Sequence, residues 1–273
     1  ITTELPIGAG ISSSAALECG IAKGLNHLFD LNLSDIELIE ISRMAEHNFV
    51  GTKCGVMDQF AVTMGQNNKL LLLNCESLKY QLIDANFSPY KIVLLNSNVS
   101  HNLASSEYNT RRAECNMALK IIQEQHANFN FLADVPEVIV ESLKEKLPGK
   151  VYQRALYVSR ENSRTLKAAS LMQAGKIEGF GALMYQTHMG LSKNYEVSCP
   201  ELDFLVSLTL DLPQVVGSRI MGGGFGGCTI NLVKEDFVQN LMEMAEEQYK
   251  KKFDITLTPI LVETSNGVEI TNY

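Results

Sequence analysis

The sequence has no pair of cysteines at the spacing of a metal-binding or redox motif. Six cysteines are scattered along the 273 residues, and no two of them form a Cys-x-x-Cys pair. This spacing indicates neither a zinc site nor a disulfide framework. We therefore expect a reducing compartment and a cytoplasmic protein.

Basic residues and long apolar runs are scarce as well. Lys and Arg number 23 against 31 Asp and Glu, which gives a formal net charge of −8. This excess of acid argues against nucleic acid or an acidic membrane surface as the main partner, although it leaves room for a local basic pocket for phosphate. No apolar run is long enough to span a bilayer, and we find no signal peptide. We therefore expect neither a nucleic-acid partner nor a membrane partner.

What the sequence does contain is the composition of a globular protein with alternating helices and strands. Hydrophobic residues make up 45% of the 273 residues, which are enough for one large domain or two medium ones. Apolar residues at helical spacing predict helices, and short continuous apolar runs predict buried strands. The predicted helices are 14–29, 137–146, 152–173, 177–189 and 234–253, with others beginning at Ser34, at Ser105 or Ser106, and at Pro200. The predicted strands are 70–73, 81–83, 92–95, 228–233 and 260–263.

The stretch from Leu5 to Ala16 combines glycines, three consecutive serines and the start of a helix. Gly8 and Gly10 lack a Cβ, so the backbone can approach a ligand closely. Ser12 to Ser14 fall where the first N–H groups of the helix have no partner, and those donors form a site for phosphate together with the positive end of the helix dipole. The alternative is that the serines only cap the helix, although one oxygen usually suffices for a cap. The stretch is neither a Walker A loop nor a Rossmann motif, because no Gly-Lys-Ser/Thr follows and a serine stands in place of the third glycine.

Two acidic residues and a second glycine cluster are further candidates for a functional site. Glu46 lies beside the apolar stripe of the second helix, where a solvated edge is the ordinary interpretation and a ligand role the alternative. Asp58 lies between Met57 and Phe60, so it either caps the next helix or is drawn inward, where it needs a partner or a function. The run 222–227 has five glycines in six residues, which favours close approach to a ligand over a simple corner between two strands.

Three stretches, in this order, together resemble the GHMP kinases (galacto-, homoserine, mevalonate and phosphomevalonate kinases). They are Pro6 to Ala15, Cys54 to Phe60, and Met221 to Cys228. Within that superfamily the chain is most similar to the galactokinase family, on the Cys-Gly-x-Met-Asp-Gln pattern, on residues 105–112 and on the position of Glu46 relative to Asp58. Without this resemblance, Tyr108 would be read as ordinary packing in the first turn of its helix.

The resemblance implies an α+β fold of two domains with the active site in the cleft between them. The N-terminal domain would resemble the second domain of ribosomal protein S5, and the C-terminal domain would be ferredoxin-like. We assign residues 1–98 to the remainder of the N-terminal nucleotide-binding domain and 99–273 to the C-terminal GHMP kinase domain.

The resemblance also implies an activity, which is transfer of the γ-phosphoryl group of MgATP to the C1 hydroxyl of galactose by a monomeric enzyme. Asp58 would be the base at the sugar hydroxyl, Gly55 and Tyr108 would contact the sugar together with Asp58, and Ser14 and Glu46 would hold Mg²⁺. The glycines from 222 to 227 would shape the cleft from the second domain. The residues implied around the ATP phosphates are Pro6, Gly8, Ala9, Gly10, Ile11, Ser12, Ser13 and Ser14.

One family motif is not found in the sequence. Galactokinases carry an N-terminal motif with an Arg, a Glu-His pair and an Asp, whereas this chain begins at Ile1 with its glycine stretch close behind. We therefore expect the chain to be part of a longer protein and its first domain to expose apolar surface, with instability or association as a result. The alternatives to a galactokinase are a related kinase for N-acetylgalactosamine or arabinose, a sensor that binds sugar and nucleotide without turnover, and a non-catalytic fragment.

Overall fold

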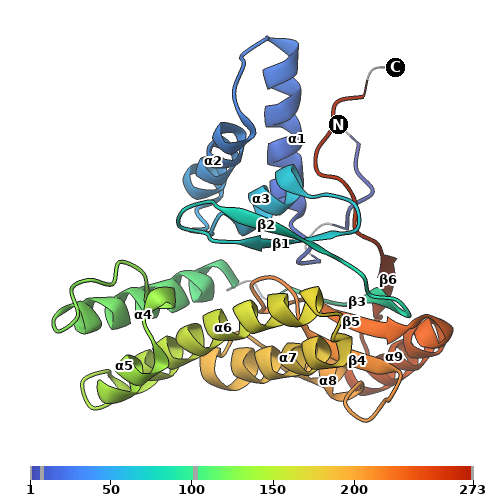
Figure 1. Cartoon of the computed structure of the whole chain (residues 1–273). Coiled ribbons are helices and arrows are strands. Elements are labelled where there is room, and N and C mark those ends of the chain that lie inside the picture. The colour runs from blue at the N-terminus through green and yellow to red at the C-terminus, as the bar shows by residue number, and fades with distance from the viewer. Residues whose placement is uncertain (1, 7–8, 101–103, 272–273) are drawn as a thin grey trace.

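The computed structural model describes residues 2–6, 9–100 and 104–271, and side chains at 100 and 104–106 are left aside. The chain forms two lobes, one above the other in Figure 1. The upper lobe contains helices α1 (Ser13–Leu28), α2 (Asp35–Ala45) and α3 (Met57–Met64), the π-helical turn η1 (Glu46–Val50), and the antiparallel hairpin of β1 (Lys69–Leu73) and β2 (Tyr80–Asp84). Gly8 lies outside the described residues.

The lower lobe is built on a four-stranded antiparallel sheet with the order β4-β5-β3-β6. Its strands are β3 (Tyr90–Ser100), β4 (Val215–Ile220), β5 (Gly226–Lys234) and β6 (Thr258–Val262). Our boundary after residue 98 falls near the end of β3, and the partners of β3 come from the C-terminal part of the chain. Two helices, α8 (Pro200–Ser207) and α9 (Val238–Phe253), cover the face that carries Val93, Leu95 and Val233.

A layer of helices completes the lower lobe (Figure 1). Its members are α4 (Ala104–Gln123), α5 (Glu137–Ser142), α6 (Gly149–Gln173) and α7 (Ile177–Gly190). Ala118 and Ile122 of α4 pack against Ala155 and Leu156 of α6 in one buried cluster. Helix α7 continues into the π-helical turn η3 (Leu191–Tyr195), and short 3₁₀ turns η2 (Leu132–Asp134) and η4 (Glu235–Phe237) precede α5 and α9.

The mixture of helices and antiparallel sheet confirms the predicted α+β class, and the predicted elements are found with small shifts. Helix α5 ends at Ser142, before the predicted 146, and a 3₁₀ turn replaces the first part of the helix predicted from 234. Strand β4 and the two π-helical turns were not predicted. Among the described residues, no helix is long and apolar enough to cross a membrane.

Candidate active site

A cavity of about 660 Å³ brings together residues that the sequence analysis singled out separately. Ser14 of α1, Glu46 of η1 and Asp58 of α3 line it from the upper lobe, and Tyr108 of α4 lines it from the lower lobe. Gly55, Gly222 and Gly223 complete this part of the wall. One cavity therefore contains a helix start, two carboxylates, a phenol and a glycine turn.

The start of α1 has an unusual backbone. Ser12 is at the N-cap with a left-handed conformation (φ 60°, ψ 38°), and its side chain makes no capping hydrogen bond with a described residue. The alternative that the serines only cap the helix therefore does not hold for Ser12. The first bond of the helix runs from the N–H of Ala16 to the carbonyl of Ser12, so the N–H groups of residues 13–15 have no acceptor within the helix.

The other members of the predicted phosphate loop occupy different surroundings. Ala9 is buried, and Ile11 packs on the same cluster of the lower lobe. Pro6 and Gly10 are exposed. Ser13 and Ser14 border a second hollow beside Leu17 and Ile21 of α1. Of the described members, Ser14 alone also lines the cavity that contains Glu46 and Asp58.

Glu46 is buried, contrary to the ordinary interpretation of a solvated edge. It is 8% exposed, and its Oε2 atom has no hydrogen-bond partner among the described residues. The neighbouring carboxyl of Glu18, one turn beyond Ser14 on α1, also has an unpartnered oxygen within that set. Burial, followed by the proximity of Glu46, raises the pKa of Glu18 to about 7.

The oxygen atoms that line the cavity decide whether the site suits Mg²⁺. The described residues contain no cluster of three or more His, Cys, Asp or Glu that could hold a metal by itself. Mg²⁺ is commonly held by one or two protein oxygens together with water and substrate phosphates. The Ser14 hydroxyl and the Oε2 atom of Glu46, which has no hydrogen-bond partner among the described residues, line the wall of one cavity and fit such a partial set.

Asp58 is a residue of the first turn of α3 rather than its cap. Val56 holds the N-cap position, so the capping interpretation of Asp58 is wrong. Asp58 is half-buried and lines the cavity, and Arg112 of α4 lines the same cavity. Arg112 donates to the carbonyls of Lys53 and Cys54 and forms no ion pair with a described carboxylate. The sequence analysis included Arg112 in the stretch 105–112 but assigned it no role, because nothing in that stretch predicts that α4 approaches Asp58.

Tyr108 faces the glycine turn across the cavity. Burial is the main reason why the pKa of Tyr108 is raised. A Cβ atom added to Gly223 would lie 3.6 Å from the ring of Tyr108, so Gly223 lies directly beside that ring. The loop that contains Gly55 is held beside Tyr108, since Asn109 and Arg112 bond to its backbone at Lys53.

The glycine turn joins β4 to β5, so it is both a corner between two strands and a wall of the cavity. The N–H of Phe225 donates to the carbonyl of Val197 at 2.7 Å, and Gly224 has a φ of +81°. A Cβ at Gly227 would lie 3.0 Å from the carbonyl oxygen of Ala9. The Sγ atom of Cys228 donates to the same oxygen at 3.0 Å. The glycines thus let the turn pack directly against the loop that precedes α1.

Comparison with known proteins supports a common origin for these features. Residues 1–66 match the GHMP kinases N terminal domain, and residues 168–251 match the GHMP kinases C terminal family. The chain is 40% identical over 270 residues to a galactokinase of Clostridium acetobutylicum, covering 98% of this chain and 69% of that protein. It is 39% identical over 269 residues to a galactokinase of Thermotoga maritima, covering 98% of this chain and 74% of that protein.

Solved structures give the same picture. The crystal structure of Lactococcus lactis galactokinase complexed with galactose superposes with a TM-score of 0.92 at 31% sequence identity, covering 97% of this chain and 68% of that chain. A mevalonate kinase of L. major in complex with R-mevalonate superposes with a TM-score of 0.61 at 17% identity, which concerns the fold alone.

Proposed function

Because the chain belongs to the galactokinases of the GHMP kinase family, we propose that the cavity lined by Ser14, Glu46, Asp58 and Tyr108 is where the γ-phosphoryl group of ATP passes to the C1 hydroxyl of galactose. The chain is an ATP-dependent sugar kinase of the galactokinase type. The product of the proposed reaction is galactose 1-phosphate. The observation that carries the proposal is that four residues from four separate elements line one cavity.

The nucleotide phosphates lie at the start of α1 in this proposal. The N–H groups of residues 13–15, which have no acceptor within the helix, and the positive end of a 16-residue helix favour an anion there. The hydroxyls of Ser12, Ser13 and Ser14 would add donors, and Pro6, Gly8, Ala9, Gly10 and Ile11 would be the remaining residues of the nucleotide-binding stretch. Backbone donors held in place before the reaction are suited to phosphoryl transfer, which needs alignment and charge stabilisation more than covalent assistance.

Ser14 and Glu46 are the proposed protein ligands of Mg²⁺. The ion would neutralise charge on the phosphates when bound. The unpartnered oxygen of Glu46 supports the assignment, because a buried carboxylate oxygen without a donor is costly unless a cation or hydrogen-bond donor reaches it.

Asp58 is the proposed group at the reacting hydroxyl. Its place in the first turn of α3 fixes the carboxylate in the cavity wall opposite Tyr108 and the glycine turn. Since carboxylates are weak bases, its main contribution is to orient the sugar hydroxyl and accept the proton late, as the oxygen bonds to phosphorus. Gly55 and Tyr108 would then contact the sugar, and Arg112 would supply positive charge near Asp58.

We also propose that the enzyme acts in the cytoplasm. All six cysteines are free, including exposed Cys75 and half-buried Cys54 and Cys115. Free thiols on a protein surface persist in reducing compartments.

The test is release of ADP by the protein with MgATP and each of five conditions, namely galactose, glucose, N-acetylgalactosamine, arabinose and no sugar. Galactose-dependent release that disappears in Asp58→Asn, with ATP binding retained in a separate binding assay, is the expected result. Asp211→Asn is the matched control, because Asp211 is exposed and distant from the cavity lining. Preference for N-acetylgalactosamine or arabinose would reassign the substrate. Binding of ATP and galactose without turnover would instead make the chain a sensor or a non-catalytic fragment, and full activity in Asp58→Asn would remove Asp58 from the mechanism.

A further inference from the structure

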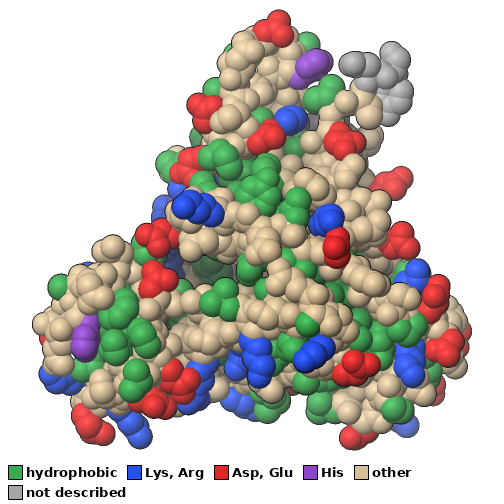
Figure 2. Space-filling model, in the orientation of Figure 1, with side chains coloured by type: hydrophobic (Ala, Val, Ile, Leu, Met, Phe, Trp, Pro, Cys, Tyr) green, Lys and Arg blue, Asp and Glu red, His purple; other side chains and the backbone are tan. Residues whose placement is uncertain are grey.

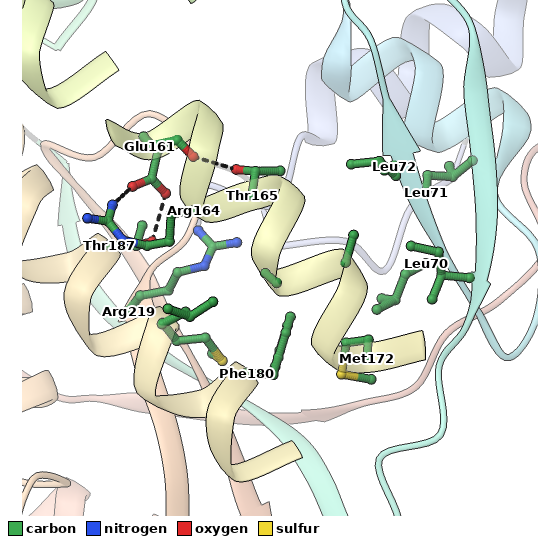
Figure 3. Close-up of a pocket in the computed structure, with 15 residues that line it drawn as sticks. Leu70, Leu71, Leu72, Glu161, Arg164, Thr165, Met172, Phe180, Thr187 and Arg219 are labelled. Carbon is green, nitrogen blue, oxygen red and sulfur yellow. Dashed lines mark hydrogen bonds and ion pairs between the residues drawn. The ribbon is translucent and has the colours of Figure 1, made fainter. Parts of the chain in front are cut away.

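A second cavity lies between the lobes, away from the candidate active site. Its volume is about 320 Å³, and it shares no lining residue with the cavity that contains Asp58. Hairpin β1–β2 forms one wall, helices α6 and α7 form another, and Arg219 enters from β4 (Figure 3).

The charged side chains that line this cavity carry more positive than negative charge. Glu161 forms an ion pair with Arg164 and accepts a hydrogen bond from the Thr187 hydroxyl at 2.7 Å. Arg219 donates to the carbonyl of Ile220 at 2.8 Å and has no carboxylate oxygen of the described residues within ion-pair distance. Figure 3 shows the Arg219 guanidinium in the space between Glu161 and Phe180, with no interaction drawn to its neighbours. Two guanidinium groups and one carboxylate leave the cavity with one positive charge in excess.

An unmatched guanidinium is a costly group in such a place. Arginine keeps its proton, and its planar head offers five N–H donors, most of which need acceptors. The side chain of Arg219 is partly buried, and this burial lowers the pKa of its guanidinium, whereas the negative charge of Glu161 acts in the opposite direction without forming an ion pair. A carboxylate ligand would relieve this cost by pairing with the guanidinium in two parallel hydrogen bonds.

The residues in the remaining walls, and the volume of the cavity, determine which kind of group the rest of the ligand can be. Leu70 and Leu72 of the hairpin face Met172 of α6 and Phe180 of α7 across the cavity. A volume of about 320 Å³ is at the lower end of the range of about 300–1,000 Å³ for small-molecule sites. The excess of a single positive charge matches a monoanion better than a phosphate dianion, which would retain an unpaired charge.

From these observations we propose that this cavity is a binding site for a small organic monoanion, a carboxylate with an apolar tail, whose head pairs with Arg219 and whose tail lies between the hairpin and α6. The site is separate from the proposed phosphoryl transfer, so its existence does not depend on the sugar that the enzyme uses.

The experiment is ligand-detected NMR and calorimetric titration of the chain with hexanoate, and with hexanamide as the neutral control of equal size. Saturable binding of hexanoate is expected in the wild type, with hexanamide at least about tenfold weaker because a charge-assisted pair is lost. Arg219→Gln should weaken hexanoate binding by a similar factor. Arg160→Gln is the matched control, because Arg160 pairs with Glu137 and Glu141 outside the cavity lining.

A second variant covers the case in which Arg219→Gln fails to fold. Ala168→Leu fills the cavity from α6 and keeps Arg219, so it should also abolish hexanoate binding. Three results would overturn the proposal, namely no saturable binding in the millimolar range, equal binding of hexanamide, or displacement of hexanoate by MgATP. A wild-type chain that binds hexanoate but has no kinase activity would contradict the proposed function and leave the proposal for this cavity standing.

Discussion

Glu18 lies one turn along α1 from Ser14, and its carboxyl is close to the carboxyl of Glu46 and to the side-chain amide of Gln59. The raised pKa of Glu18, about 7 against an ordinary 4.5, means that the folded protein holds a proton that the unfolded chain releases. Between these two values, each rise in pH favours the unfolded state. The contribution of Glu18 to stability is therefore fully present below pH 4.5 and is lost as the pH rises through about 7.

Replacement of Glu18 by Gln removes this titration and should leave a protein whose stability depends less on pH. We expect the melting temperature of Glu18→Gln to exceed that of the wild type by a few degrees more at pH 8 than at pH 5. Thermal unfolding in buffer with a chelator measures the difference without metal at Glu46. Glu124→Gln, at an exposed residue, is the control and should follow the wild type at both pH values. A parallel pH dependence of Glu18→Gln and wild type would refute the assignment.

A substitution at Gly224 can show why the turn 222–227 is so rich in glycine. A Cβ at this position would lie 2.1 Å from the carbonyl oxygen of Val197, and the φ of +81° is unfavourable for any side chain. Gly224→Ala should therefore lower the free energy of unfolding by about 2–4 kcal/mol. Gly223→Ala should cost less than about 1 kcal/mol, since its new methyl would meet the Tyr108 ring at an ordinary 3.6 Å. Urea unfolding of both variants decides the point, and equal midpoints would contradict a steric role for Gly224.

Among the elements, the segment Leu191–Val197 connects the buried charges of the lower lobe to the glycine turn. Arg111 donates from Nε to the carbonyl of Tyr195 at 2.8 Å, and fully buried Arg154 donates to the Glu196 carboxylate at 2.8 Å. Hydrogen bonds from Lys150 and then Arg154 lower the pKa of Glu196 to about 2. The carbonyl of Val197 in turn accepts from Phe225 in the turn. The arginines therefore position the glycine turn that lines the proposed active site.

Removal of Arg154 should affect both the buried charges of the lower lobe and the glycine turn. Arg154→Met leaves the carboxylates of Glu114 and Glu196 without their buried partner, which costs about 3–5 kcal/mol in comparable networks. The glycine turn loses support, so kcat for galactose should fall even at temperatures where circular dichroism shows a folded protein. Lys150→Met removes an exposed partner of the same Glu196 and should cost less than about 1 kcal/mol with kcat nearly unchanged. If Arg154→Met loses stability but keeps the wild-type kcat, the network supports the fold alone.

Elements of regular pattern were predictable from the sequence, whereas those that depend on a neighbour were not. Helix α1 follows from the helical spacing of its apolar residues, and strands β3 and β5 follow from short continuous runs of residues typical of strands. Strand β4 was missed because it carries Gly217, Ser218 and Arg219, which do not resemble a buried run. The glycine is needed there since a Cβ at Gly217 would lie 2.6 Å from the Cα of Gly181 in α7. The π-helical turns were missed for a similar reason, because a widened turn is typical of a functional site and has no simple sequence pattern.

At the scale of the whole molecule, the site residues that belong to sequence motifs were predictable, and those that enter from elsewhere were not. Ser14, Glu46, Asp58 and Tyr108 carry the family resemblance and line one cavity. No motif marks Glu18, and the stretch that contains Arg112 gives it no role of its own. The position of Glu18 beside Glu46, and that of Arg112 on the loop at Lys53, follow from packing. The cavity with Arg219 likewise arises because a hairpin, two helices and a strand meet, which no single stretch of sequence indicates.

The upper lobe exposes an apolar stripe along α1, in line with the apolar surface expected for the first domain. Leu17, Ile21, Leu25 and Leu28 recur at helical spacing and are all classed as exposed, with Leu28 at 70%. Hydrophobic side chains reach the surface elsewhere on this lobe as well (Figure 2). A contiguous apolar stripe on a protein surface favours association, since contact with a second copy removes apolar side chains from water.

We therefore predict that this chain associates through α1 at micromolar concentration. Sedimentation velocity should show a concentration-dependent shift to larger species that disappears in the double variant Ile21→Gln and Leu25→Gln. The melting temperature of that variant should fall only slightly, because the two side chains are already 42% and 45% exposed. The control replaces Val138 and Leu210, which are also exposed but lie on the lower lobe, by Gln and should leave the association unchanged. A wild-type chain that remains monomeric over the whole concentration range would show that the stripe is too narrow to hold two copies together.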